Sequence, residues 1–141
     1  MKAHTREQRL WVVFTDQTDL WWLKILPKGF RHCFVLIHDG RNWITVDPLS
    51  SRMEIVVQDV PQDFDLPAWL KSEGHIVLRA RKMEREAKPA PMMPFSCVET
   101  VKRILGIHAR GVITPWQLYQ HLQCRKSGEF FQKNRSTLCQ M

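Results

Sequence analysis

The sequence has few cysteines, and their spacing excludes two common uses. Only four occur in the 141 residues, namely Cys33, Cys97, Cys124 and Cys139. They form no C-x-x-C pair, and none has a histidine at zinc-finger spacing, so the pattern predicts neither a metal cage nor a disulfide framework. We therefore expect reduced thiols, no metal, no cofactor and a reducing compartment.

Long apolar runs are also missing. Nowhere does the chain reach the roughly 18 consecutive apolar residues that indicate a membrane-spanning helix. The first ten residues, M-K-A-H-T-R-E-Q-R-L, lack the apolar stretch of a secretory signal. The sequence thus predicts no membrane span, no signal peptide and a cytoplasmic location.

Acidic residues are outnumbered, with 14 Asp and Glu against 21 Lys and Arg and a net charge of +7. The basic residues are scattered and lack the interleaved aromatics of a base-stacking platform, so we expect a solvated basic surface and no specific nucleic-acid binding. Apolar residues make up 44% of the chain and include six Trp and seven Phe, which is ample for one packed core. We predict a single domain over residues 1–122 and a polar, basic C-terminal tail over residues 123–141.

Periodicity indicates a mixture of strands and helices. Runs rich in β-branched and aromatic residues predict strands over residues 10–14, 30–38, 42–46, 53–60 and 75–81. Capping signals predict helices over residues 66–72, from Cys97 to Gly106, and from Thr114 to about Gln123. Residues 20–26 fit either a strand or a helix, and residues 82–94 predict an extended connector. These elements favour an α+β fold.

The clearest signal is a hairpin between residues 30–38 and 42–46, and its register decides one possible contact. If Asp39 and Gly40 are the loop residues, His32 lies directly opposite Asp47. Their Cβ atoms would then be about 4.5–5.5 Å apart, so an imidazole N–H could reach a carboxylate. If the loop is Gly40 and Arg41 instead, Phe34 lies opposite Asp47 and the argument for the contact weakens.

The segment P-F-S-C-V-E-T-V-K-R-I-L-G, residues 94–106, places a cysteine on the first turn of a helix. Ser96 followed by Glu99 is a capping box, and Gly106 ends the helix. Cys97 is then at the first helical position, where unpaired N–H groups and the helix dipole favour a thiolate. The alternative interpretation is that Cys97 is a small buried apolar residue that happens to follow a cap.

A cysteine nucleophile needs a base and a group that orients the base. We hypothesise a Cys97–His32–Asp47 triad, in which His32 pairs with the thiolate and Asp47 holds the imidazole tautomer. The backbone N–H of Cys97 is the natural first oxyanion donor. Cys33 neighbours His32 but points to the opposite face of the strand, so we predict that it packs in the core.

These residues resemble a known family. F-R-H-C-F-V-L-I-H-D-G-R-N-W-I-T-V-D-P, followed by P-F-S-C-V-E-T-V-K-R-I-L-G, is similar to the circularly permuted branch of the NlpC/P60 superfamily of papain-like cysteine peptidases and acyltransferases. The resemblance implies a small antiparallel β-sheet with the nucleophile helix packed against it, and His32, Asp47 and Cys97 match the family's histidine, polar third residue and cysteine. The signatures G-F-R-H-C-F and T-P-W-Q-L-Y also resemble small proteins of tailed phages and related prophage elements.

The resemblance implies a thiol hydrolase, a peptidase or amidase acting on a peptide or acyl substrate, with a cell-wall peptide the family's commonest substrate class. An alternative function is a non-catalytic phage virion or tail assembly protein that keeps the papain-like fold. Such a protein would be virion-associated and would bind its neighbours through the aromatic N-terminal half and the basic tail. A third function class is an acyltransferase on a lipid.

Overall fold

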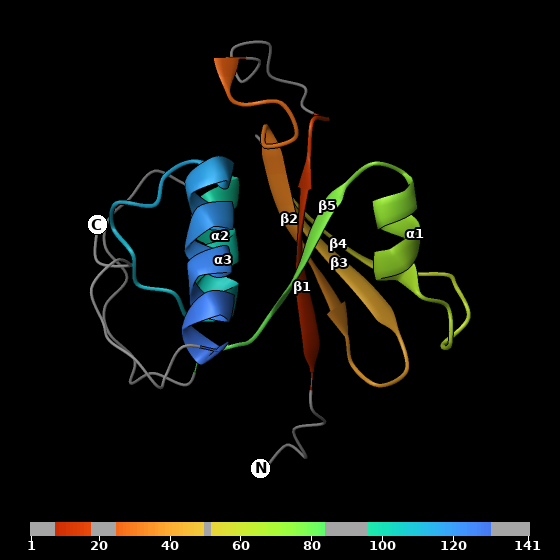
Figure 1. Ribbon diagram of the computed structural model, residues 1–141. Coiled ribbons are helices and arrows are strands. Elements are labelled where there is room, and N and C mark those ends of the chain that lie inside the picture. The colour runs from red at the N-terminus through yellow and green to blue at the C-terminus, as the bar shows by residue number, and fades with distance from the viewer. Residues whose placement is uncertain (1–7, 18–24, 50–51, 84–95, 131–141) are drawn as a thin grey trace.

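The computed structural model describes residues 8–17, 25–49, 52–83 and 96–130. Within these ranges the fold is α+β, with five strands and three helices (Figure 1). The elements in chain order are β1 (Arg9–Thr15), β2 (His32–His38), β3 (Trp43–Pro48), β4 (Met53–Gln58), α1 (Leu66–Ser72), β5 (Ile76–Ala80), α2 (Cys97–Leu105) and α3 (Pro115–Phe130). The strands and helices predicted from periodicity are therefore confirmed, with shifts at their ends.

The strands form one antiparallel sheet in the order β4-β3-β2-β1-β5. Helices α2 and α3 cover one face of this sheet, and α1 covers the other (Figure 1). The side chains of β1 alternate between two hydrophobic cores. Val12 belongs to the core between the sheet and helices α2 and α3, the α2/α3 core. Val13 belongs to the core between the sheet and α1, the α1 core. Because both faces of the central strands are covered, β1 is a continuous apolar run instead of an alternating one. The predicted packing of the Cys97 helix against an antiparallel sheet is confirmed.

Helix α2 begins and ends where the sequence predicts. The Ser96 hydroxyl accepts a hydrogen bond from the Glu99 backbone N–H at 3.2 Å. Gly106 follows the last turn with a φ of 69°, a left-handed conformation that glycine adopts without steric cost. Cys97 is consequently fixed at the first helical position.

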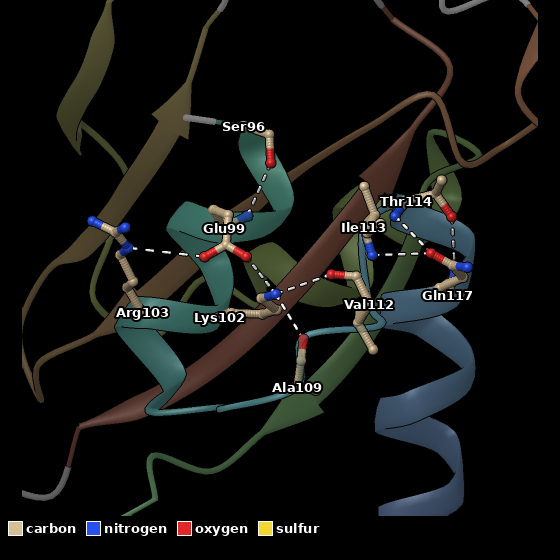
Figure 2. Close-up of polar contacts among 9 residues, drawn as sticks. All are labelled: Ser96, Glu99, Lys102, Arg103, Ala109, Val112, Ile113, Thr114 and Gln117. Carbon is tan, nitrogen blue, oxygen red and sulfur yellow. Dashed lines mark hydrogen bonds and ion pairs between the residues drawn. The ribbon is translucent and has the colours of Figure 1, made fainter. Parts of the chain in front are cut away.

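The carboxylate of Glu99 has a different partner from the one that a reciprocal capping box implies. It pairs with the ammonium group of Lys102 and lies 3.9 Å from Nε of Arg103 (Figure 2). Lys102 also donates to the carbonyl oxygens of Ala109 and Val112, at 2.8 and 3.0 Å. Glu99 and Lys102 thus connect α2 to the segment that leads into α3.

The start of α3 has the full reciprocal box. Gln117 N–H donates to the Thr114 hydroxyl at 3.3 Å, while the Gln117 side-chain oxygen accepts from the N–H groups of Ile113 and Thr114 at 2.9 and 3.0 Å (Figure 2). Pro115 occupies the first turn, where its missing N–H has no intrahelical role. The predicted helix start is confirmed.

The preferred hairpin register is wrong. His38 is opposite Trp43 and Val35 is opposite Val46, which is the register of the Gly40–Arg41 loop. The reason lies in Asp39, whose Oδ1 accepts from the N–H groups of Arg41 and Asn42 at 2.8 and 2.7 Å. Asp39 therefore closes the turn from outside the two central residues, as an Asx turn does.

The expectation that the helical pattern ends at Gln123 is also wrong, because α3 continues to Phe130. Packing of Leu118 and Leu122 in the core fixes the first turns of α3. Adding further residues to an established helix then requires little free energy, and no proline interrupts the segment. The ambiguous residues 20–24, most of the connector at 84–94 and the tail at 131–141 lie outside the described residues.

Candidate active site

His32 and Asp47 come together at the end of the sheet where β2 begins. His32 Nε2 lies 2.6 Å from Asp47 Oδ1. Their side chains are 13% and 29% exposed, respectively, so the contact is shielded but reaches solvent. Continuing the ladder places Phe34, not His32, opposite Asp47, so the pair is a diagonal one within a face of the sheet. The imidazole is long enough to span that diagonal.

Cys97 is the third member of the group. It lies close enough to the His32 side chain for each group to shift the pKa of the other. Since Nε2 of the imidazole is engaged by Asp47, Nδ1 is the nitrogen left for the cysteine. Cys97 is only partly buried, at the edge of the α2/α3 core. The structure thus joins His32 and Asp47 directly, and Cys97 of α2 is linked to them through its electrostatic effect on His32.

Burial alone would lower the pKa of His32, because it disfavours the charged imidazolium. The hydrogen bonds to Asp47 and Cys97, and the negative charges of both, outweigh burial and raise the pKa to about 9. For the pKa of Cys97, the interaction with the Cys33 side chain is the largest cause and lowers it. Burial comes next and raises this pKa, and the interaction with His32 and the charge of His32 lower it. The net result lowers the pKa of Cys97 to about 5. At neutral pH the pair is therefore a thiolate and an imidazolium.

Cys33 is the residue that sequence reasoning missed at this site. Its side chain is fully buried in the α2/α3 core, as predicted, and it is also the largest cause of the lowered pKa of Cys97. Burial, the first cause, and the adjacent Cys97 thiolate raise the pKa of Cys33 well above the ordinary value, so it remains a neutral thiol. The available signal was its strand parity, since a residue on the face that carries α2 also faces Cys97.

The electrostatic surroundings of Cys97 suit a nucleophile. The Ser96 hydroxyl accepts a hydrogen bond from the Glu99 N–H, and the Ser96 carbonyl oxygen accepts one from the Thr100 N–H at 3.0 Å. The N–H of Cys97 itself precedes these groups, at the positive end of the α2 dipole. It is therefore placed to donate to an oxyanion that forms on a carbon attached to the sulfur.

Within the described residues, no three His, Cys, Asp or Glu side chains are grouped so that they could hold a metal ion. Among the described helices, none combines the length and hydropathy required for a transmembrane segment.

Comparisons of the chain with protein-family models, curated protein sequences and solved structures find no match.

Proposed function

We propose that this protein is a thiol hydrolase of amide or ester bonds with Cys97 as nucleophile, His32 as general acid and base, and Asp47 as the orienting group. We further propose that its fold is a permuted papain-like one of the NlpC/P60 type, because a histidine on an early strand precedes a cysteine at the start of a late helix. The observation that carries the function is the 2.6 Å contact between His32 and Asp47 beside Cys97, where His32 and Cys97 shift each other's pKa toward the imidazolium and the thiolate.

In the acylation step the Cys97 thiolate attacks the carbonyl carbon of the substrate and forms a carbon–sulfur bond. The negative charge moves to the carbonyl oxygen, which the Cys97 N–H stabilises. As the tetrahedral intermediate collapses, the imidazolium of His32 gives its proton to the leaving amine or alcohol. The products of this step are a thioester on Cys97 and a neutral His32.

Water then hydrolyses the thioester. Neutral His32 takes a proton from the water as it attacks the acyl carbon, and the thiolate departs with the carboxylic acid released. Asp47 keeps Nε2 engaged throughout, so that Nδ1 faces the sulfur in both steps. A peptide bond of the cell wall is the substrate class that we propose first, and acyl transfer to a lipid would use the same thioester.

The first test is the reactivity of Cys97 at neutral pH. We expect iodoacetamide to label Cys97 much faster than the exposed Cys124 of α3, and His32→Ala to remove that difference. The second is turnover of a chromogenic ester and of purified peptidoglycan peptides, which Cys97→Ser should abolish. Slow and equal labelling of Cys97 and Cys124 in the native protein would overturn the proposal that the protein is a thiol hydrolase.

A second candidate function, a non-catalytic phage assembly protein, is favoured by β4. This edge strand exposes apolar side chains, with Ile55 65% and Val57 60% exposed. An exposed strand edge of this kind pairs readily with a strand of another protein, here a neighbouring virion subunit. The labelling experiment separates the two functions, because an assembly protein has no need of an activated thiolate.

A further inference from the structure

The exposed apolar side chains of this protein are concentrated on one short strand. β4 is at an edge of the sheet, and within the described residues its only hydrogen-bonded neighbour is β3. Four of the eight large apolar side chains that are exposed in the described part of the chain belong to β4, namely Met53, Ile55, Val56 and Val57. Single exposed apolar residues are ordinary, but a run of them along an unpaired backbone edge marks a place where another strand pairs.

The two edges of the sheet differ in how they are protected. The opposite edge, β5, carries the exposed Arg79, and the exposed Arg81 follows directly after the strand. Like charges along an edge oppose the approach of a second strand. β4 contains no lysine, arginine or proline, and its one charged residue, Glu54, lies 3.7 Å from the guanidinium group of the preceding Arg52. Of the two edges, only β4 is therefore open to pairing.

The side chains of β4 extend both faces of the sheet beyond the covered part. Ile55 is opposite Val46 of the α2/α3 core, so Ile55 and Val57 lie on the face that carries α2 and α3. They are nevertheless 65% and 60% exposed. Val56 is opposite Thr45 and lies on the other face. The buried core thus ends at β3, while apolar side chains continue onto β4.

A second copy of β4 complements the first in one antiparallel register. An antiparallel pair that is related by a two-fold axis through the sheet is centred on a residue opposite its own copy. A pair centred on Val56 sets Ile55 against Val57 of the second copy. It also sets Glu54 against Gln58 of the second copy, so a carboxylate faces an amide that can donate to it. Centring the pair on either neighbouring residue would instead set Glu54 against a valine, which removes a carboxylate from water without a partner.

We propose that this protein forms a dimer in which β4 pairs antiparallel with β4 of a second copy, centred on Val56, so that the two sheets become one continuous sheet. This inference goes beyond the proposed hydrolysis and does not require it. For the assembly function, it identifies the neighbouring subunit as a second copy of this chain.

The first test is the molar mass of the full chain in solution, measured by light scattering after size exclusion over a wide range of protein concentration. We expect the mass of a dimer. Ile55→Lys combined with Val57→Lys should give a monomer at every concentration, because ammonium groups of both copies would meet across the paired strands. Both side chains are more than half exposed, so the monomer should keep its fold, which far-UV circular dichroism checks.

Trp69→Lys is the matched control for this variant. Trp69 is also a large apolar residue and is 47% exposed, but it lies on α1 and not on the β4 edge. The control should remain a dimer. A wild-type protein that is a monomer at every concentration would overturn the proposal and leave β4 for a strand of a different protein. A dimer that persists in the variant with both lysines would also overturn it, because another surface would then hold the copies together.

The second test fixes the register on a chain in which every cysteine except the buried Cys33 is replaced by serine. With Val56→Cys added, mild oxidation should give a disulfide-linked dimer, because directly opposite Cα atoms are about 4.5–5.5 Å apart. Val57→Cys should not cross-link, because its copy lies on the diagonal, about 7–8 Å away. Equal cross-linking of the two variants would contradict the pairing. Hydrolysis enters neither test, so failure of the dimer and failure of the hydrolase are distinguishable.

Discussion

Nε2 of His32 lies 2.6 Å from Oδ1 of Asp47 even though the two residues are not directly opposite each other in the β2–β3 ladder. The contact instead runs along the diagonal of the ladder, and it is the length of the imidazole that closes it. An orienting carboxylate can therefore serve a histidine from either of two registers.

The alkylation of Cys97 should report its lowered pKa. Because the folded protein lowers the pKa of Cys97 to about 5, the rate of iodoacetamide labelling should rise as the pH increases through about 5 and then level off before neutrality. The matched control is the urea-unfolded chain, in which labelling should rise only near the ordinary thiol pKa of about 8.5. A native profile that coincides with the unfolded one would show that no ion pair with His32 forms.

Asp47→Asn should move the alkaline limit of hydrolysis to lower pH. His32 must carry a proton for the leaving group, so activity should fall as the pH rises through about 9, where the imidazolium is lost. The carboxylate of Asp47 is one cause of that raised pKa, and a neutral amide removes its charge. The measurement is the pH profile of ester turnover. Asp39→Asn, in the turn of the same hairpin, should leave the profile unchanged because Asn can also accept from the turn N–H groups.

Lys102→Met should destabilise the protein by about 3–5 kcal/mol, because it leaves the carboxylate of Glu99 buried without its main counter-charge. The Lys102 and Glu99 side chains are only 4% and 8% exposed, and the variant also removes the bonds to the Ala109 and Val112 carbonyls. Urea denaturation measures the loss. Arg103→Met is the control, since Arg103 is 52% exposed and 3.9 Å from Glu99. Equal midpoints for the two variants would refute the assignment.

Gly106→Ala should cost about 1–2 kcal/mol from the left-handed conformation alone. A Cβ at Gly106 would also come within 2.7 Å of the Met83 carbonyl oxygen, so the backbone must shift as well. Gly111→Ala is a close control, because a Cβ there meets nothing within 4 Å. We expect a clear drop in melting temperature for Gly106→Ala and little change for Gly111→Ala. The opposite order would contradict the assigned end of α2.

Much of the fold was predictable because its signals are local. The cap at Ser96 and the stop at Gly106 define α2 from neighbouring residues, and Thr114 with Gln117 starts α3 in the same way. The hairpin register was not predictable to the residue. A side-chain bond from Asp39 to the turn decides it, and that bond competes with an equally reasonable two-residue loop. The continuation of α3 to Phe130 depends on core packing that anchors the helix, which a fading polar pattern does not reveal.

By itself, the sequence determined the elements and the position of Cys97 on the first turn of a helix, because caps, glycines and β-branched runs act over a few residues. Strand order, the diagonal approach of His32 to Asp47 and the effect of Cys33 on the pKa of Cys97 were decided only by the tertiary structure. Each of these joins segments far apart in the chain. Their geometry follows from how the sheet and the helices pack, and no short stretch of residues encodes that.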